Sequence, residues 1–250
     1  MFIPEKNSHK GENGKLLIIA GSKQYHGSAV LAIQAAKRFV DLVYFYPGEN
    51  DCYLINAVKN IPEVIVVYDL KILEKCDAVL FGPGLGDAKV DGKEIFEKAK
   101  KIIVDGDGFR KIRKEMLNEK FLLTPHEGEF EYFFGEKGRK ENVKGMAKKY
   151  GCVILKKGPV DFVSDGKKVY EIKGGNAGLT KGGTGDVLAG FVSALATKNS
   201  LLESALIGAK VLKKAGELAF KKYGYWYSAG DVIEYLPEGL KTLKIGWKRT

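Results

Sequence analysis

The sequence predicts an α/β protein, a three-layer α/β/α sandwich around a mostly parallel central sheet. Over the first two thirds of the chain, short apolar runs rich in β-branched residues alternate with segments of helical periodicity. These runs are continuously apolar, which is typical of parallel strands that are covered on both faces. A hairpin pattern and a helical region follow, so we expect the sheet to end in antiparallel strands and the chain to end in helices.

Seven strands are expected in the parallel part of the sheet. They are residues 15–20, 43–45, 64–67, 78–81, 102–104, 121–123 and 153–155. Between the first two, residues 29–41 place polar Gln34, Lys37, Arg38 and Asp41 on one face of a helix. The other face is apolar, so this segment should be a helix that packs on the sheet.

The last third of the chain follows a different pattern. Residues 161–172 predict a hairpin with Asp-Gly at its turn. A helix of small residues is expected over 184–197, a longer helix over 201–223 and a short helix near Asp231. With no repeat or linker in the sequence, we interpret residues 1–250 as a single domain.

Composition excludes several classes of protein. The chain has 250 residues, 45% of them hydrophobic and 29% charged, so neither wholesale disorder nor a collagen or coiled-coil structure is expected. No apolar run is long enough to span a membrane. The first residues lack the apolar centre of a secretory signal, and three cysteines without a C-x-x-C pair indicate reduced thiols. A cytoplasmic protein without a membrane partner is predicted.

The net charge of +10 favours anionic ligands. The lysines are spread along the chain and interleaved with glutamates, as in residues 89–101. That distribution is typical of a solvated surface and not of a nucleic-acid interface. A small anionic ligand is therefore expected, and nucleic acid is not.

A glycine-rich segment before a predicted helix is the strongest indication of function. Residues 176–186 read N-A-G-L-T-K-G-G-T-G-D. Free N–H groups at the positive end of a helix bind anions such as a phosphoryl group. Asp186 should stay ionised there and can take a proton from a substrate hydroxyl. The structural alternative is a glycine turn capped by an aspartate, and neither the Walker A nor the G-x-G-x-x-G motif fits.

Four more segments, in order along the chain, resemble those of a known family. Residues 14–29 read G-K-L-L-I-I-A-G-S-K-Q-Y-H-G-S-A, residues 77–86 read D-A-V-L-F-G-P-G-L-G, residues 123–130 read L-T-P-H-E-G-E-F and residues 155–158 read L-K-K-G. With the glycine segment they resemble the ADP-dependent NAD(P)H-hydrate dehydratases of the ribokinase-like superfamily. The resemblance runs from His9 to Ile233, nearly the whole chain.

That resemblance implies repair of nicotinamide cofactors whose ring has been hydrated. In this family a nucleotide phosphorylates the ring hydroxyl, phosphate is eliminated, and NADH or NADPH is regenerated. Phosphate leaves far more readily than hydroxide, so the sequence of steps is chemically coherent. Microbial members use ADP and release AMP, whereas eukaryotic members use ATP. We expect ADP here, with ATP as the alternative donor, Mg²⁺ as cofactor and a homo-oligomer. The companion epimerase is expected as a separate protein or as the other half of a longer architecture.

The resemblance also implies roles for individual residues. The residues expected to contact the hydrate are Ser28, Gly84, His126 and the catalytic Asp186. The residues expected to bind the nucleotide are Lys157, Gly158, Pro159, Val160 and Asp161, with Gly185 at the phosphates. His126 has a structural alternative, because it can cap a turn after a strand. Lys157 has one as well, since it follows Lys156 and only one of the two should face the pocket.

The metal ligands are not assigned by the sequence. Glu127 and Glu129 can hold Mg²⁺ through water, or they can be solvated loop acids. The chain departs from the family pattern at Ser28, where we expect alanine, and at Glu127, where proline is common. It also has D-G-D-G-F at 105–109 instead of D-A-D-A-L, and the extra glycines should loosen a turn beside the pocket.

Two other functions were weighed against the dehydratase. Ribokinase-like kinases of a small alcohol, such as a sugar or a vitamin precursor, share the glycine–aspartate element and use ATP. The segments G-P-G-L-G and T-P-H-E-G-E-F favour the dehydratase. A catalytically silent nucleotide-binding or nucleic-acid-associated protein is the third possibility. The presence of Asp186 argues against a silent enzyme, and the dispersed lysines argue against a nucleic-acid surface.

Overall fold

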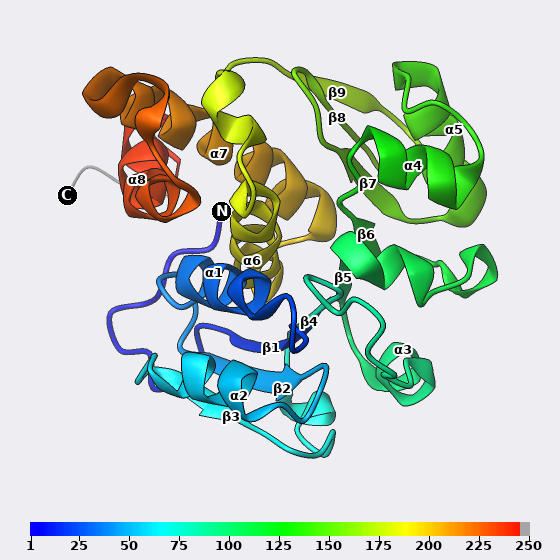
Figure 1. Ribbon diagram of the computed structural model, residues 1–250. Helices are drawn as coiled ribbons and strands as arrows, with labels where there is room; N and C mark the ends of the chain where they lie inside the picture. The colour runs from blue at the N-terminus through cyan, green and yellow to red at the C-terminus, as the bar shows by residue number, and fades with distance from the viewer. Residues whose placement is uncertain (246–250) are drawn as a thin grey trace.

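The computed structural model describes residues 1–245 and is built on one nine-stranded sheet (Figure 1). Its strands are β1 (Lys15–Ala20), β2 (Leu42–Pro47), β3 (Val64–Val66), β4 (Ala78–Phe81), β5 (Ile102–Val104), β6 (Phe121–Leu123), β7 (Val153–Lys156), β8 (Asp161–Ser164) and β9 (Val169–Ile172). The order across the sheet is β3-β2-β1-β4-β5-β6-β7-β8-β9. The strands from β1 to β7 are parallel, and β8 and β9 are antiparallel to their neighbours.

Helices cover both faces of the sheet. They are α1 (His26–Ala36), α2 (Cys52–Lys59), α3 (Lys93–Lys98), α4 (Glu127–Phe134), α5 (Lys140–Tyr150), α6 (Thr184–Ala196), α7 (Leu201–Tyr223) and α8 (Ala229–Thr242). The apolar side chains of α1, α2, α6, α7 and α8 join one core, and those of α3, α4 and α5 join the other. In Figure 1, α1, α6 and α7 lie side by side in the first of these layers, with α8 beyond α7. The predicted three-layer α/β/α architecture is confirmed.

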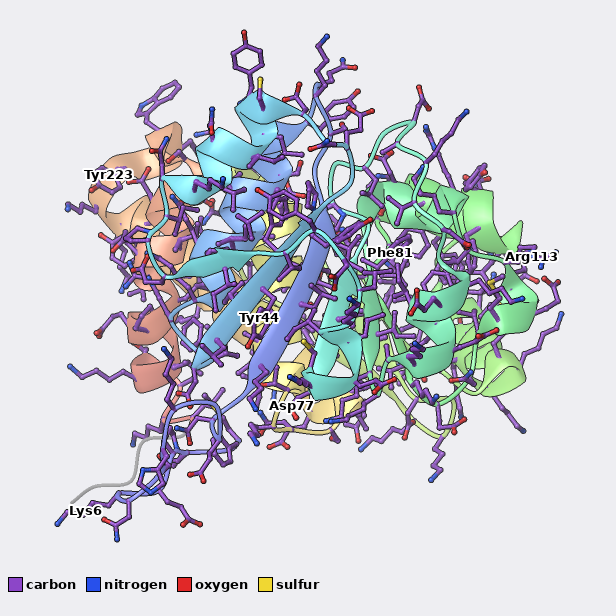
Figure 2. The ribbon with its side chains drawn as sticks, turned by 90° about the horizontal axis from the view of Figure 1, so that it is seen from below. Lys6, Tyr44, Asp77, Phe81, Arg113 and Tyr223 are labelled. Carbon is purple, nitrogen blue, oxygen red and sulfur yellow. The ribbon has the colours of Figure 1, made fainter. Side chains whose placement is uncertain are left out.

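Strand β1 explains why the strands are continuously apolar. Leu16 and Ile18 belong to the first core, and Leu17 and Ile19 belong to the second. Because successive side chains of a strand point to opposite faces, a strand with two covered faces needs apolar residues at every position. Phe81 of β4, labelled in Figure 2, lies on the second face. Its ring meets that of Phe96 in α3 edge-on, with 5.2 Å between the ring centroids.

Small residues bring α6 close to its neighbour α1. A Cβ on Gly190 would lie 2.1 Å from the carbonyl oxygen of Ala32, so no side chain fits between these two backbones. Gly190, Ala189 and Ala194 are all buried in α6. The small-residue helix expected from the sequence is therefore the central helix of its layer.

The predicted strands and the late hairpin are confirmed, whereas two helices differ from expectation. The helix expected over 29–41 begins at His26 and ends at Ala36. Asp41 is not on a helix face, since its Oδ2 accepts the backbone N–H groups of Gly11 and Asn13 at 2.7 and 3.0 Å. The short helix near Asp231 is α8, fourteen residues long, because its apolar face continues along α7.

The parallel strands all end at the same edge of the sheet, where ligands bind in open α/β sheets. The loops that follow β1, β4, β5, β6 and β7 therefore lie next to one another. Helix α6 starts at this edge after the glycine-rich segment. No helix within residues 1–245 is both long and apolar enough to cross a membrane.

Candidate active site

The glycine-rich segment ends where α6 begins. Gly183 is the N-cap of the helix, and Asp186 lies in its first turn. The hydroxyl of Thr184 donates to the carbonyl oxygens of Leu179 and Lys181 at 2.7 and 2.9 Å, so the loop is tied to the helix. The backbone N–H groups of the first turn have no partner within a helix and can bind an anion.

Asp186 lies in a site where its charge is disfavoured. Burial raises the pKa of this carboxyl, the nearby Asp105 raises it further, and the result is about 7. The hydroxyl of Ser28 donates a hydrogen bond to Asp186 and opposes the shift, as does Lys157. An aspartate that stays fully ionised was expected; with a pKa of about 7 this carboxyl is instead partly protonated near neutral pH, because burial and Asp105 disfavour its charge. A carboxyl of this kind is matched to proton transfer at neutral pH.

Lys157 is held among carboxylates close to the start of α6. Its Nζ lies 2.6 Å from Asp105 Oδ1 and 3.8 Å from Glu129 Oε2. Thr124 also donates its hydroxyl to Asp105 Oδ1, at 2.8 Å. Burial disfavours the charged form of Lys157, but Asp105 and Glu129 more than compensate, and the pKa is raised. Lys157 is therefore a permanent cation, and a Cβ on Gly185 would lie 3.5 Å from its Nζ.

His126 caps a helix, which is the structural alternative considered for it, and it also lines a pocket. Its Nδ1 accepts the backbone N–H of Glu129 at 3.2 Å, and Glu129 Oε2 accepts the backbone N–H of His126 at 2.8 Å. This reciprocal capping box starts α4. It also sets the Glu129 carboxylate beside Lys157. Burial raises the pKa of Glu129, and Asp105 adds to the shift.

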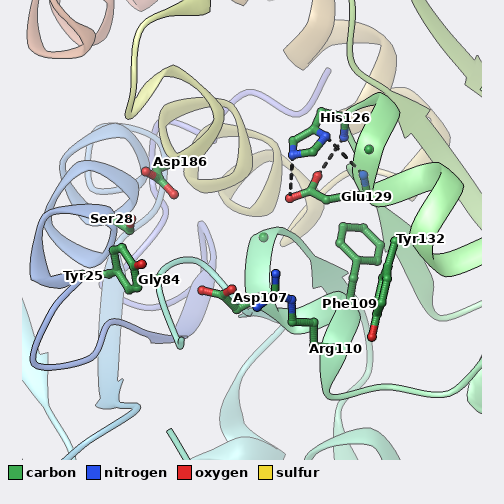
Figure 3. A pocket seen from close by; sticks show the side chains of 12 residues that line it. Tyr25, Ser28, Gly84, Asp107, Phe109, Arg110, His126, Glu129, Tyr132 and Asp186 are labelled. Carbon is green, nitrogen blue, oxygen red and sulfur yellow. Dashed lines mark hydrogen bonds and ion pairs between the residues drawn. The ribbon is translucent and has the colours of Figure 1, made fainter. Parts of the chain in front are cut away.

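A pocket of about 450 Å³ joins these elements (Figure 3). Its lining residues are Tyr25, Ser28, Gly84, Gly106, Asp107, Phe109, Arg110, His126, Gly128, Glu129, Tyr132 and Asp186. All four residues expected to contact the hydrate are among them. Figure 3 shows Asp186 and Ser28 on one side of the pocket and His126 with Glu129 on another. Gly84 has a φ of +63°, and a Cβ there would meet the carbonyl oxygen of Tyr25 at 2.7 Å, so glycine is required.

The loop expected to bind the nucleotide lies beside this pocket and is not part of its lining. Asp161 Oδ1 accepts the backbone N–H of Gly158 at 2.8 Å. The buried Nζ of Lys213, on α7, lies 3.4 Å from Asp161 Oδ2 and donates to the carbonyl oxygens of Gly158 and Pro159 at 3.1 and 3.2 Å. The carboxylate of Asp161 therefore shapes the loop from within, while Pro159 is exposed and Val160 is half-buried.

The two glutamates considered for Mg²⁺ lie in different surroundings, one inside the pocket and one outside it. Glu127 Oε2 lies 2.6 Å from the Nζ of Lys156, and its Oε1 accepts the backbone N–H of Gly138. It is outside the pocket, whereas Glu129 is inside it. Within residues 1–245 no group of three or more His, Cys, Asp or Glu side chains is arranged to hold a metal ion.

The glycines of residues 105–109 do not loosen the turn as expected. Gly106 adopts a φ of +57°, and a Cβ on Gly108 would lie 2.8 Å from the carbonyl oxygen of Phe81. They permit the loops after β4 and β5 to pack closely. Asp105 is a residue of this site to which the sequence analysis assigns no role. Asp105 directly follows β5, and that position at a strand end was the available signal.

Comparisons with known proteins identify the family of this chain. The family model for NAD(P)H-hydrate dehydratase matches residues 16–238. The chain is 38% identical to the bifunctional NAD(P)H-hydrate repair enzyme of Methanocaldococcus jannaschii, over 95% of this chain and 50% of that enzyme. It is 35% identical to the ADP-dependent (S)-NAD(P)H-hydrate dehydratase of Cenarchaeum symbiosum, over 96% of this chain and 93% of that protein.

A solved structure shares the fold. The ADP/ATP-dependent NAD(P)H-hydrate dehydratase of Bacillus subtilis, co-crystallised with ATP and Mg²⁺, is 25% identical, with a TM-score of 0.79 over 96% of this chain and 93% of that one. The chain spans about half the length of the bifunctional relatives that it matches. The ribokinase-like architecture expected from the resemblance is thus confirmed, and the chain belongs to the NAD(P)H-hydrate dehydratase family.

Proposed function

We propose that this chain dehydrates the (S)-hydrate of NADH or NADPH with ADP as phosphoryl donor, releasing AMP and phosphate. The observation that carries the proposal is Asp186, a buried carboxyl with a pKa of about 7 at the start of α6, facing a pocket with Lys157 beside it. The C. symbiosum relative that bears the name of this activity matches nearly the full length of this chain.

The first step is phosphoryl transfer. The ring hydroxyl oxygen of the hydrate attacks the β-phosphorus of ADP, and the carboxylate of Asp186 accepts the hydroxyl proton. The bond from the β-phosphorus to the bridging oxygen breaks, and AMP leaves. Negative charge spreads over the transferring group, where the N–H groups of the first turn of α6 and the ammonium of Lys157 stabilise it.

The second step is elimination. The bond between the ring carbon and the new phosphate oxygen breaks, and its electron pair leaves with the phosphate. The neighbouring ring carbon loses a proton, which the departing phosphate takes up, and the double bond of the reduced cofactor is restored. The balance is hydrate plus ADP to reduced cofactor, AMP, phosphate and one proton, which Asp186 received in the first step and releases to solvent.

The residue roles follow from this arrangement. Ser28, Gly84 and His126 line the pocket with Asp186 and would contact the hydrate. The residues that would bind the nucleotide are Lys157, Gly158, Pro159, Val160, Asp161 and Gly185. Support for that assignment comes from Lys157, whose ammonium lies beside Gly185, and from Pro159, which is exposed in the loop.

Mg²⁺ fits this site only together with the nucleotide. No cluster of protein ligands within the described residues would hold it alone, and Mg²⁺ commonly binds through phosphates, water and one or two carboxylates. Glu129 is the carboxylate in the pocket that suits this role. When bound, Mg²⁺ would neutralise charge on the transferring phosphate.

Partners and location are proposed on the same basis. The relatives named bifunctional are about twice as long as this chain, which supports a partner epimerase acting on the same metabolite. A homo-oligomer remains a prediction. A cytosolic location is supported by three free cysteines; burial raises the pKa of Cys76 and Cys152 to about 12, which keeps both thiols unreactive.

One assay tests the activity. Purified protein is incubated with hydrated NADH, Mg²⁺ and either ADP or ATP, and the return of dihydronicotinamide absorbance is followed. We expect recovery with ADP and its near-complete loss in Asp186→Asn. Asp91→Asn, at an exposed aspartate outside the pocket, is the matched control and should keep full activity. A phosphorylated small alcohol formed in the absence of cofactor recovery would instead support the ribokinase-like kinase.

A further inference from the structure

A second cavity, of about 550 Å³, adjoins the pocket of Asp186. Its lining residues are Ser22, Lys23, Gln24, Tyr25, Glu49, Gly86, Asp87, Asp107 and Arg110. Tyr25, Asp107 and Arg110 line both cavities, so the two lie side by side. Asp186, Ser28 and His126 belong to the first cavity only.

The second cavity lies on the side of the pocket away from the nucleotide loop. Its residues follow β2, β1, β4 and β5, whereas the first cavity draws on the ends of β1, β4, β5 and β6. The loop of residues 157–161 follows β7, farther along the same edge of the sheet. A substrate whose reacting ring lies between Asp186 and that loop must therefore extend the remainder of its length toward β2.

Arg110 lies where the two cavities meet, and its positive charge is not used in an ion pair among the described residues. The residue is exposed. Figure 3 shows its side chain beside Asp107, on the side of the pocket away from Asp186. A guanidinium matches the geometry of phosphate oxygens. Lys23, in the second cavity, is likewise exposed and unpaired among the described residues.

Carboxylates in the second cavity are held by the backbone. Asp107 Oδ2 accepts the N–H of Gly86 at 2.8 Å, and Glu49 Oε2 accepts the N–H of Lys23 at 2.8 Å. Each leaves its other oxygen available, and the exposed Asp87 lies in the same lining. Carboxylates at such an edge accept hydrogen bonds from ribose hydroxyls in dinucleotide sites.

We propose that the second cavity binds the adenosine-phosphate half of the dinucleotide substrate, with Arg110 at the diphosphate that joins the two halves. This inference rests on the proposed function. Lys23 and Arg110 would bind the phosphates, and the carboxylates of Glu49 and Asp87 would accept hydrogen bonds from the ribose hydroxyls. The ring that reacts occupies the pocket of Asp186, and the adenosine half lies over the ends of β1 and β2.

Kinetics with a shortened substrate test this assignment. The hydrate of reduced nicotinamide mononucleotide has the reacting ring and one phosphate but lacks the adenosine half. We expect its KM to be about tenfold or more above that of NADH hydrate. Lys23→Glu should raise the KM of NADH hydrate about tenfold and leave that of the mononucleotide hydrate unchanged. Arg110→Ala should raise both, since both substrates place a phosphate at the junction.

Arg113→Ala is the matched control, because Arg113 is exposed nearby but lines neither cavity. It should change neither KM. Equal KM values of the two hydrates with the wild-type protein would overturn the inference. So would a Lys23→Glu variant that handles NADH hydrate as the wild type does.

Direct binding separates this inference from the proposed reaction. With AMP saturating the nucleotide loop, ADP-ribose should bind in calorimetry as one further equivalent, and Lys23→Glu should weaken that binding about tenfold. Such binding without conversion of either hydrate would disprove the reaction and still support the second cavity as an adenosine-phosphate site. ADP-ribose binding that Lys23→Glu and Arg110→Ala leave unchanged would refute the site.

Discussion

The ammonium of Lys157 lies 2.6 Å from the carboxylate of Asp105, across the ends of three neighbouring strands. Asp105 follows β5, Thr124 follows β6 and Lys157 follows β7. Thr124 and Lys157 both donate to the same oxygen, Asp105 Oδ1. Each of the three strand ends thus contributes one residue to a hydrogen-bonded group of side chains. This group holds the ammonium of Lys157 beside the first turn of α6.

Asp105→Asn tests the role of this pair. The variant removes a negative charge that raises the pKa of Asp186, so the acid limb of the pH–rate profile should move to lower pH. It also loosens Lys157, which should lower kcat. Because Asp105 is buried, some loss of stability is expected as well. Profiles of kcat/KM for wild type and variant decide the matter: a limb at an unchanged pH would mean that Asp105 is merely structural.

The activity should depend on pH through Asp186. Its carboxylate accepts a proton only when ionised, and its pKa is about 7. We therefore expect kcat/KM for the hydrate to rise tenfold per pH unit below about 7 and to level off above it. Initial rates with saturating ADP, taken from about pH 5 to about pH 9, measure this. A flat profile across that range would exclude Asp186 as the proton acceptor.

The buried carboxyl of Asp186 should also lower the free energy of unfolding when it is ionised. Its pKa is about 7 in the folded protein against 3.8 ordinarily, so the folded state binds the proton more tightly and stability falls as pH rises from about 4 through 7. Asp186→Asn removes that penalty. The variant should be more stable than the wild type by roughly 4 kcal/mol above pH 7, with no such gain near pH 4. Denaturant unfolding at the two pH values measures this, and an equal difference at both would contradict the explanation.

Much of the fold was predictable because its signals are local. Continuous apolar runs identified the parallel strands, and the Asp-Gly turn identified the hairpin at 165–166. Helices α2, α3, α4 and α5 were not predicted. The first three have six to eight residues, which give too few turns for a clear periodicity, and α5 buries only Val143 and Ala147. Helix α1 was placed too late because Asp41 resembles a polar helix position but anchors the loop at Gly11.

The candidate site was predictable only in part. Glycine and aspartate before an apolar helix indicate an anion site from one short segment, and the structure places Ser28, Gly84 and His126 in the pocket of Asp186. The partners that tune Asp186 come from other strands, so their proximity depends on strand order. The contact between Lys213 and the nucleotide loop depends on how α7 crosses the sheet, which no local pattern encodes.

Two glycine-to-alanine changes in helices should have opposite effects. A Cβ on Gly190 would overlap the carbonyl oxygen of Ala32, so Gly190→Ala must push α6 away from α1 and lower stability by roughly 2 kcal/mol or more. Gly145 is exposed in α5 with no atom near a new Cβ, so Gly145→Ala should raise stability by roughly 0.5–1 kcal/mol. Unfolding in denaturant compares them, and changes of the same sign would refute this account of the α1–α6 contact.

Lys213 should control nucleotide binding from beneath the loop. It pairs with buried Asp161 and donates to two carbonyl groups of the loop, so Lys213→Met removes three contacts at once. We expect the KM for ADP to rise about tenfold while the KM for the hydrate changes little. Burial already raises the pKa of Asp161, and without Lys213 its ionisation is costlier, so the loss of stability should grow with pH.

Lys214→Met is the matched control on the same helix. Lys214 pairs with Glu217 in a half-exposed contact and does not touch the loop, so its loss should cost less than about 1 kcal/mol and leave the KM for ADP unchanged. Steady-state kinetics and calorimetric ADP binding compare the two variants. Equal ADP affinities of Lys213→Met and Lys214→Met would show that the loop of residues 157–161 does not depend on the ion pair between Lys213 and Asp161. The shape of the loop would then come from its own backbone and from the hydrogen bond between Asp161 and Gly158.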